Sequence, residues 1–207
     1  MTLQLWLAFV LASATMLAIP GPTLMLVISY ALGRGKSTAV ATVPGVALGD
    51  LTAMTISLLG AGAILAASAL LFTILKLVGA GYLIWLGVKL WREKPSMETL
   101  QKRGGQQSSR AMFMQAYTVT ALNPKSIVFF VAFVPQFISA DQALMSQFII
   151  LETTFVTLAA INAAIWALAA GHMRRWFTRP AALRAVNRTG GSFLIGAGLV
   201  TASLRNS

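Results

Sequence analysis

The sequence predicts an all-α integral membrane protein with six transmembrane helices. We expect two inverted three-helix repeats, with the first and fourth helices interrupted. Three observations predict this fold: an apolar composition, basic residues confined to alternate connections, and motifs that recur in both halves. Of the 207 residues, 57% are hydrophobic and 10% are charged, and the mean hydropathy is +0.76. Soluble domains carry about 25% charged residues, so most of this chain does not face water.

Six apolar runs have lengths suited to crossing a bilayer, for which a helix needs about 20 apolar residues. They cover residues 3–32, 39–67, 70–90, 112–137, 143–170 and 189–204. The last run is short, and arginines flank it at both ends. Together the six runs leave little chain for a separate soluble domain.

The basic residues gather in the first, third and fifth connections, around 34–36, 89–110 and 174–188. Cytoplasmic loops of membrane proteins carry an excess of Lys and Arg. We therefore expect these loops in the cytoplasm and both termini outside. The Gly- and Ser-containing stretch 93–110 reads as a cytoplasmic linker between repeats 1–92 and 111–207.

The two halves resemble each other in sequence. The segment Gly79–Gly87 is similar in sequence to Gly190–Gly198. In addition, Pro22 precedes Pro124 by the same number of residues as Asp50 precedes Glu152. Three spans are an odd number, so the second half would enter the membrane from the opposite side. Inverted repeats are a common plan of transporters, with the binding site near the midplane where the halves meet.

Each half contains a predicted break in a helix. Pro20, Gly21 and Pro22 interrupt the first span, because proline lacks the backbone donor and clashes with the preceding turn. In the fourth span Asn123 fits an N-cap, with Pro124 at the first helical position. A helix that starts inside a membrane presents unpaired N–H groups and its positive dipole end. A substrate carboxylate is a natural partner for Gly21–Thr23 and Asn123–Lys125, although a simple kink is the structural alternative.

Three ionisable residues lie deep in the predicted spans: Asp50, Lys125 and Glu152. A charge at the bilayer centre costs about 2.5–3.5 kcal/mol even on the lenient insertion scale, so such groups face a cavity or each other. One interpretation is a buried structural network, such as Lys125 paired with Asp50. The other is that Asp50 or Glu152 holds a substrate ammonium or carries a coupling proton. The residues alone leave the choice open.

Other polar and small residues receive structural interpretations. Lys76 lies near a span end, where its side chain would extend outward to the interface, and Tyr30 falls where interfacial aromatic residues occur. A stripe of small residues in the second span permits close contact with another helix. The stripe consists of Ala41, Gly45, Gly49 and Ala53.

Several function classes lack the residues they need. The chain has no cysteine and one histidine, His172, which lies beside two arginines in a polar stretch, so we expect no metal site and no cofactor. No ATP-binding GxxxxGK[ST] sequence is present. The net charge is +11, and the basic residues that produce it cluster in loops between the apolar runs. This placement argues against nucleic-acid binding. A membrane-embedded enzyme would need a nucleophile–base pair or a metal cluster, and it remains an alternative together with a channel or a non-transporting scaffold.

The sequence resembles the bacterial lysine exporter family of the LysE/RhtB type, which includes homoserine, threonine and leucine efflux proteins. The matching motifs are Pro20–Pro22, Gly45–Asp50, Lys76–Gly87, and Leu122–Lys125 through Phe133–Phe137. They extend over nearly the whole chain, and the last two are the most specific. The opening residues and the stretch Asn123–Val128 look closest to the homoserine/threonine branch. The family commonly has asparagine after its Pro-Gly-Pro, where this chain has Thr23.

The resemblance implies an exporter of a small amino acid in a bacterial inner membrane, driven by the proton gradient. The implied partners are the amino acid, protons and the lipid bilayer, with a homodimer as an open possibility. No enzymatic activity is expected. The expected substrate site comprises Gly21, Pro22, Thr23, Asp50, Asn123, Pro124, Lys125 and Glu152, with Asp50 and Glu152 as candidates for proton coupling. Which amino acid is exported stays open.

Overall fold

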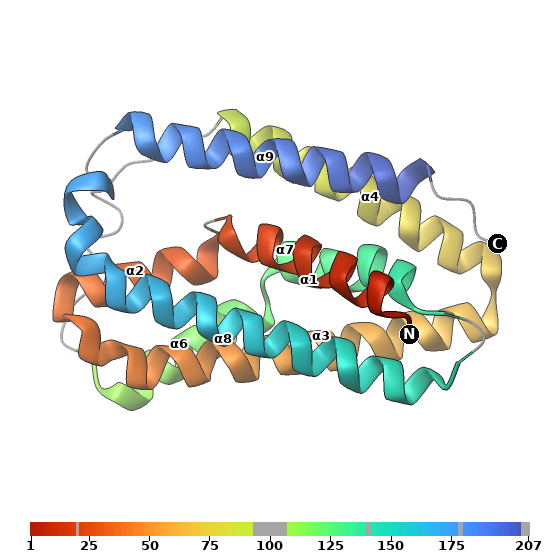
Figure 1. Ribbon diagram of the computed structural model, residues 1–207, viewed down its shortest axis with the longest axis horizontal. Coiled ribbons are helices and arrows are strands. Elements are labelled where there is room, and N and C mark those ends of the chain that lie inside the picture. The colour runs from red at the N-terminus through yellow and green to blue at the C-terminus, as the bar shows by residue number, and fades with distance from the viewer. Residues whose placement is uncertain (20, 93–106, 140–141, 178–179, 204–207) are drawn as a thin grey trace.

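The computed structural model describes residues 1–19, 21–92, 107–139, 142–177 and 180–203. Within these residues the secondary structure is helical, with turns between the helices and no strand. The helices run roughly along one long axis (Figure 1). They are α1 Leu3–Ala18, α2 Pro22–Arg34, η1 Lys36–Thr38, α3 Ala39–Ala67, α4 Ala69–Arg92, α6 Ser109–Ala121, α7 Pro124–Val128, η2 Phe129–Phe133, η3 Val134–Phe137, α8 Leu144–Phe177 and α9 Pro180–Ser203.

Several of these helices have the length and apolarity of membrane spans. Three stretches qualify directly: Lys36–Ala63, Ser109–Phe137 and Leu144–Ala170. The bent pair α1 and α2 makes a fourth if it counts as one span, and Gly191–Ser203 in α9 is a shorter apolar helix. The helical, multi-pass character of the chain is thus confirmed, whereas the count of six spans stays a prediction.

The first predicted interruption is present between α1 and α2. Helix α1 ends at Ala18 and is followed by Ile19 in an extended conformation. Helix α2 begins at Pro22, with Gly21 extended at its N-cap. The two helices are bent by 54° relative to each other. Proline suits the first helical position because its missing N–H would be unpaired there in any case.

The second interruption separates α6 from α7. Helix α6 ends at Ala121, and α7 begins at Pro124 with Asn123 as its N-cap. The side-chain oxygen of Asn123 accepts a hydrogen bond from the backbone N–H of Lys125 at 3.1 Å. The chain then continues through a π-helical turn, η2, and a 3-10 turn, η3. The break thus lies where the sequence predicts it.

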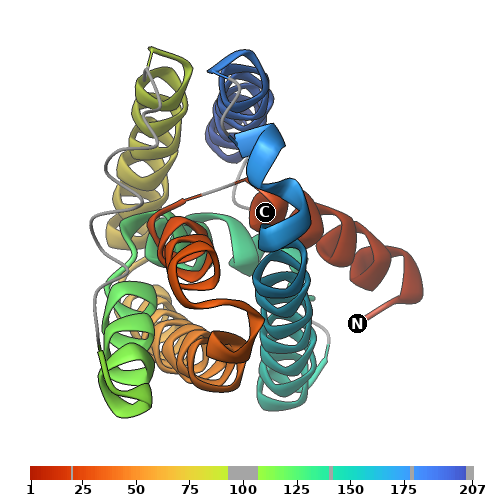
Figure 2. The same cartoon turned by 90° about the vertical axis from the view of Figure 1, so that its left-hand side faces the viewer.

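Helix α2 occupies the middle of the bundle when the molecule is viewed along its long axis (Figure 2). Its consecutive residues 26–31 are all buried, as expected for a helix with neighbours on every side. Around it, α3 packs against α6 and α8, while α4 packs against α9. Helix α1 is inclined to the other helices.

The small-residue stripe of α3 makes the close helix contact that the sequence predicts. A Cβ atom added at Gly45 would lie 2.6 Å from the backbone oxygen of Phe113. One added at Gly49 would lie 2.7 Å from Cβ of Thr120. Both positions therefore require glycine so that α3 can approach α6.

Most of the helix ends that border the basic connections lie toward one end of the molecule. The end of α2, the start of α6 and the end of α8 lie at the left of Figure 1, whereas α4 ends nearer the middle of the upper edge; α1 begins nearer the opposite end, where α9 finishes. Most of the expected linker, residues 93–106, lies outside the described residues. The division into repeats 1–92 and 111–207 stays a prediction.

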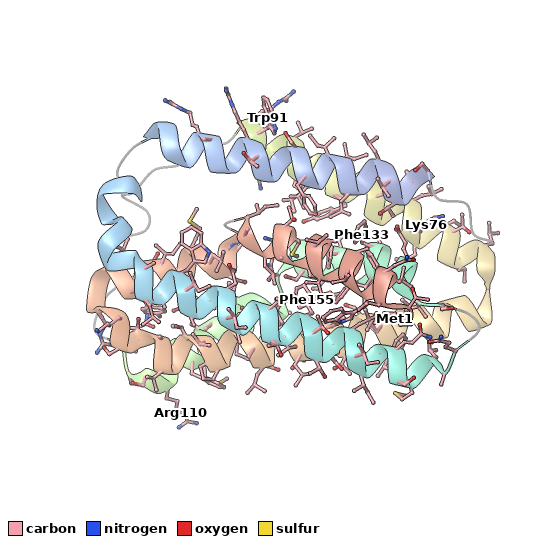
Figure 3. The ribbon with its side chains drawn as sticks, in the orientation of Figure 1. Met1, Lys76, Trp91, Arg110, Phe133 and Phe155 are labelled. Carbon is pink, nitrogen blue, oxygen red and sulfur yellow. The ribbon has the colours of Figure 1, made fainter. Side chains whose placement is uncertain are left out.

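Three residues differ from the interpretation of the sequence. Tyr30 is fully buried rather than interfacial, because its hydroxyl is bound to the side chains of Gln107 and Gln115. Lys76 is only 7% exposed, so its side chain is packed within the protein rather than extended outward (Figure 3). His172 lies within helix α8, which continues to Phe177 and so extends beyond the apolar run expected to end at residue 170.

Candidate functional site

A small cavity lies where the two interrupted spans meet. Its volume is about 20 Å³, measured as the space open to the centre of a water molecule, which is enough for about one water. The walls come from α1, α2, α3, α7 and α8 and their flanking residues. They are formed by Met16, Leu17, Gly21, Thr23, Leu24, Val46, Asp50, Asn123, Lys125, Ser126, Ala159 and Asn162.

The carbonyl end of α1 is bound by side chains from the second half of the chain. The ammonium of Lys125 donates to the carbonyl oxygens of Met16 at 3.2 Å and Ile19 at 3.0 Å. The amide Nδ2 of Asn162, on α8, donates to the carbonyl oxygen of Leu17 at 3.0 Å. The last carbonyls of a helix have no partner within the helix and form its negative dipole end. The break in the first span exposes these carbonyls, and Lys125 and Asn162 satisfy them.

Asp50 is the acidic residue of the cavity. It lies on α3 and is 3% exposed. Its Oδ1 atom has no hydrogen-bond partner among the described residues. Buried polar atoms are nearly always paired in native proteins, so each exception calls for an explanation. A donor group of a ligand at this position would provide the missing partner, and protonation would remove the buried charge.

Thr23 connects the two breaks. Its hydroxyl oxygen accepts from the hydroxyl of Thr120 at 3.2 Å and from Nδ2 of Asn123 at 3.3 Å. Asn123 is thus used twice, since its Oδ1 caps α7. No side chain caps the start of α2 at Gly21. The first N–H groups of α2 therefore remain as backbone donors beside the cavity.

Glu152 lies apart from this cavity. It is half-buried on α8 and accepts a hydrogen bond from the hydroxyl of Thr55 on α3. It is not among the residues that line the cavity, although Asp50 is. Asp50 and Glu152 occupy equivalent positions relative to Pro22 and Pro124 in the sequence. In the structure, however, only Asp50 lies at the cavity.

The structure brings together five of the eight residues that the sequence singles out. Gly21, Thr23, Asp50, Asn123 and Lys125 line the cavity. Pro22 and Pro124 are the exposed first residues of α2 and α7 and set where those helices start. Asn162 and Ser126 line the cavity without having been predicted. A polar amide within the apolar run 143–170 was the available signal for Asn162.

Packed side chains lie beside the cavity in both directions along the bundle. Phe155, one helical turn before the cavity residue Ala159 on α8, contacts Phe129 and Phe130 with ring centroids 6.0 and 4.8 Å away. Phe133 continues this aromatic cluster (Figure 3). In the other direction, α2 leads to the buried Tyr30 and its two glutamine partners.

The described residues contain no group of three or more His, Cys, Asp or Glu side chains that could hold a metal ion. The polar groups of the cavity are a carboxylate, an ammonium, hydroxyls and amides. Such a set suits a small polar ligand with charge of its own.

Comparisons with known proteins agree on a membrane transport family. Residues 14–204 match the family model described as LysE type translocator. The chain is 32% identical over 207 residues to a homoserine/homoserine lactone efflux protein of Salmonella typhimurium, covering 100% of both chains. It is also 32% identical over 205 residues to an uncharacterized membrane protein of Vibrio cholerae, covering 99% of this chain and 100% of that one.

A leucine efflux protein of Enterobacter sp. is 29% identical over 153 residues, which cover 73% of this chain and 72% of the relative. No solved structure matches the chain. The family match covers both helix breaks and all the residues that line the cavity. This chain is a multi-pass membrane protein that belongs to the LysE type translocator family.

Proposed function

We propose that the chain is a secondary active exporter of a small amino acid of the homoserine, threonine or leucine kind, driven by the proton gradient. The observation that carries the proposal is the cavity at the two helix breaks, with the buried carboxylate of Asp50 in its wall and one oxygen of that carboxylate without a hydrogen-bond partner among the described residues. Membership of a translocator family and the names of the relatives supply the direction and the class of solute.

The proposed architecture has six spans in two inverted repeats, 1–92 and 111–207. Helix pairing supports it, because equivalent elements of the two halves pair with each other: α4 with α9, and α3 with α8. The cross-pairs match at the level of whole spans, since α3 packs against α6 of the fourth span and α8 packs against both α1 and α2 of the first. A twofold axis in the membrane plane would produce both sets of pairs.

The proposed orientation places the basic connections in the cytoplasm of a bacterial inner membrane and both termini outside. The position of most of the bordering helix ends toward one end of the molecule supports this orientation. The cavity then lies at intermediate depth, between Tyr30 toward the cytoplasm and Phe155 toward the outside.

In the proposed mechanism, Asp50 receives the substrate ammonium or the coupling proton. Backbone N–H groups at the start of α2, beside Gly21 and Thr23, receive the carboxylate. Asn123 and Pro124 set the start of α7 and carry Lys125 into the cavity wall. Glu152 stays a second candidate for the coupling proton, at a location separate from the substrate.

The cavity is smaller than an amino acid, so substrate entry requires it to widen. The two breaks are the natural places for this change, because helix ends absorb backbone rotation without loss of helical hydrogen bonds. Alternating access would open the cavity first past Tyr30 and then past the aromatic cluster.

The decisive experiment is an efflux panel. Cells that overexpress the protein are loaded with homoserine, threonine, leucine or a toxic analogue, and the release of each is compared with that of cells carrying an empty vector. We expect faster release of at least one amino acid, abolished by a protonophore. Unchanged release of every amino acid would contradict export, and release insensitive to the proton gradient would favour a channel.

A further inference from the structure

Four basic side chains lie together where α4 ends and α9 begins. All four are exposed: Lys89, Arg92, Arg184 and Arg188. The two helices run antiparallel (Figure 1), and the backbone of Gly87 lies against that of Gly191. Arg184, the farthest of the four from this contact, is seven residues before Gly191, which is about 10 Å along the helix axis. Because the helices are antiparallel, all four cations lie on the same side of the contact.

Two tryptophans orient this basic cluster. The indole Nε1 of Trp91 donates to the hydroxyl of Ser192 at 3.0 Å and so joins α4 to α9. The guanidinium of Arg188 lies over the ring of Trp91, 5.1 Å from its centroid. The ammonium of Lys89 lies over the ring of Trp85, 5.3 Å from its centroid. Such contacts attract a cation to the ring face without neutralising its charge. Figure 3 shows Trp91 at the outer edge of the molecule, among side chains that end in nitrogen atoms.

The positive charge of the cluster has no acidic partner within its own two helices. Neither α4 nor α9 contains an aspartate or a glutamate. Glu93, which follows Arg92 in the sequence, lies outside the described residues, and its charge would balance only one of the four cations. Like charges repel at short range, so their grouping on one surface favours a bound anion. Guanidinium groups bind phosphate oxygens through paired N–H donors.

The surface beside the cluster is apolar. Residues of a helix at spacings of three and four share one face. The face of α4 that carries its two cations is exposed at each of these positions: Ile74, Val78, Gly81, Trp85, Lys89 and Arg92. A Cβ added at Gly81 would meet nothing within 4 Å, and the same holds for Gly196 on α9. Because Gly198 contacts Ala80, these two open glycines lie within about one helical turn of each other along the pair. An apolar strip, lowest at its glycines, thus leads away from the cations.

We propose that the basic cluster and the apolar strip form a binding site for an anionic phospholipid. The phosphate is held by Lys89, Arg92 and Arg188, and an acyl chain lies over Gly81. A phospholipid joins a charged phosphate to apolar chains, and this surface presents cations, tryptophans and an apolar strip in the same order. The apolar run of α4 ends and that of α9 begins at the cluster, and basic and aromatic residues at span ends lie at the level of lipid headgroups. Basic sites between transmembrane helices bind such headgroups.

The alternative is a general attraction between basic helix ends and a negatively charged membrane. Lys36 and Arg110 provide the comparison. Both are exposed, and Arg110 lies at the opposite edge of the molecule from Trp91 (Figure 3). A general attraction depends on how many charges are removed, whereas a binding site depends on which ones are removed. The cluster residues do not line the cavity at the helix breaks, so the inference is independent of the proposed export function.

The test measures thermal unfolding of the purified protein in micelles that contain phosphatidylcholine, phosphatidylglycerol or cardiolipin. We expect either anionic lipid to raise the unfolding temperature by about 3–6 °C over phosphatidylcholine, as for a ligand at about ten times its Kd. The double variant Arg92→Gln with Arg188→Gln should lose most of this rise. The double variant Lys36→Gln with Arg110→Gln removes the same charge and should keep the rise to within about 1 °C.

Several outcomes would overturn the inference. One is an equal unfolding temperature of the unaltered protein in anionic and zwitterionic lipid, and another is an equal loss of the rise in both double variants. Inorganic phosphate at the same concentration separates a lipid from a free anion. An equal rise with phosphate alone would contradict the site, because the acyl chain would then contribute nothing.

Native mass spectrometry of the unaltered protein is a second measurement that needs no variant. From an equimolar mixture of phosphatidylcholine and phosphatidylglycerol, we expect the retained lipid to be phosphatidylglycerol by about 5-fold or more. Equal retention of the two lipids would count against the site even if the double variants failed to fold.

Discussion

The ammonium of Lys125 donates a hydrogen bond to the carbonyl oxygen of Ile19, 3.0 Å away, and so joins the start of α7 to the end of α1. These two residues belong to opposite halves of the chain. The contact explains how a charged side chain is tolerated at this depth: its partners are backbone carbonyls that the helix break has left without donors.

Replacing Asp50 by Asn should abolish proton-driven export. The amide removes the negative charge that a substrate ammonium or a coupling proton requires, while it keeps the size of the side chain. In liposomes with an imposed pH gradient, we expect uphill transport to fall by about 100-fold or more, in the range typical of a lost buried charge pair. Unchanged coupling to the gradient in this variant would remove Asp50 from the mechanism.

The companion variant Glu152→Gln should be milder, because Glu152 lies outside the cavity and binds Thr55. We expect its transport to stay within about 10-fold of the unaltered protein, because the amide oxygen still accepts from Thr55 and only the charge assistance of that hydrogen bond is lost. The two variants are measured in the same vesicles at matched protein content. A larger loss in Glu152→Gln than in Asp50→Asn would reverse the assignment of the two carboxylates.

Lys125→Met should lower the stability of the protein. The substitution preserves most of the apolar stem but leaves the carbonyls of Met16 and Ile19 without a donor, at a cost of about 1–3 kcal/mol. Thermal unfolding in detergent measures the effect. Lys36→Met, at an exposed lysine in η1, is the matched control and should leave the unfolding temperature unchanged. Equal unfolding temperatures for both variants would mean that the carbonyl contacts do not stabilise the fold.

Gly49→Ala should destabilise the contact between α3 and α6. Its added Cβ would lie 2.7 Å from Cβ of Thr120 and 2.8 Å from the backbone oxygen of Tyr117, so the helices must separate. We expect a loss of about 1–3 kcal/mol, as for other overpacked sites. Gly60→Ala is the control on the same helix, since a Cβ there meets nothing within 4 Å. A stability change of the same sign and size in both variants would contradict the close contact.

Thr23→Val should reduce both transport and stability, whereas Thr23→Ser should preserve them. Valine has the shape of threonine but cannot accept the hydrogen bonds from Thr120 and Asn123. Two donors beside the cavity would then lack a partner, at a cost of about 1–3 kcal/mol each if they stay buried. Efflux rate and unfolding temperature are measured on the same preparations. Full activity in the valine variant would show that this hydroxyl neither links the breaks nor contacts substrate.

The sequence predicts the helix breaks and the buried charges well, because both depend on local chemistry. Pro22 and the Asn123–Pro124 pair act on the backbone next to them, and a charge in an apolar run is visible without any structure. The role of Asn162 was not predictable in this way. Its partner, the carbonyl of Leu17, lies in a different span and is free only because that span is broken.

Partners that are distant in the sequence also account for the residues whose surroundings the sequence does not predict. Position within a span predicts an interfacial Tyr30, but Gln107 and Gln115 provide partners that allow it to be buried. Likewise, Glu152 and Asp50 occupy corresponding positions in the sequence, yet only Asp50 faces the cavity. Equivalent positions in two divergent halves share a backbone path, and each side chain then depends on neighbours that the repeat does not conserve.

The contact between α4 and α9 has a mechanical consequence. A Cβ added at Gly87 would lie 2.6 Å from the backbone oxygen of Gly191, and one added at Gly198 would lie 2.7 Å from that of Ala80. The two backbones thus meet at two separate points along their length. Two helices in contact at two points can neither pivot nor slide relative to each other without losing one of the contacts. During a transport cycle, α4 and α9 would therefore move together as one rigid body, and the remaining helices would move relative to this pair.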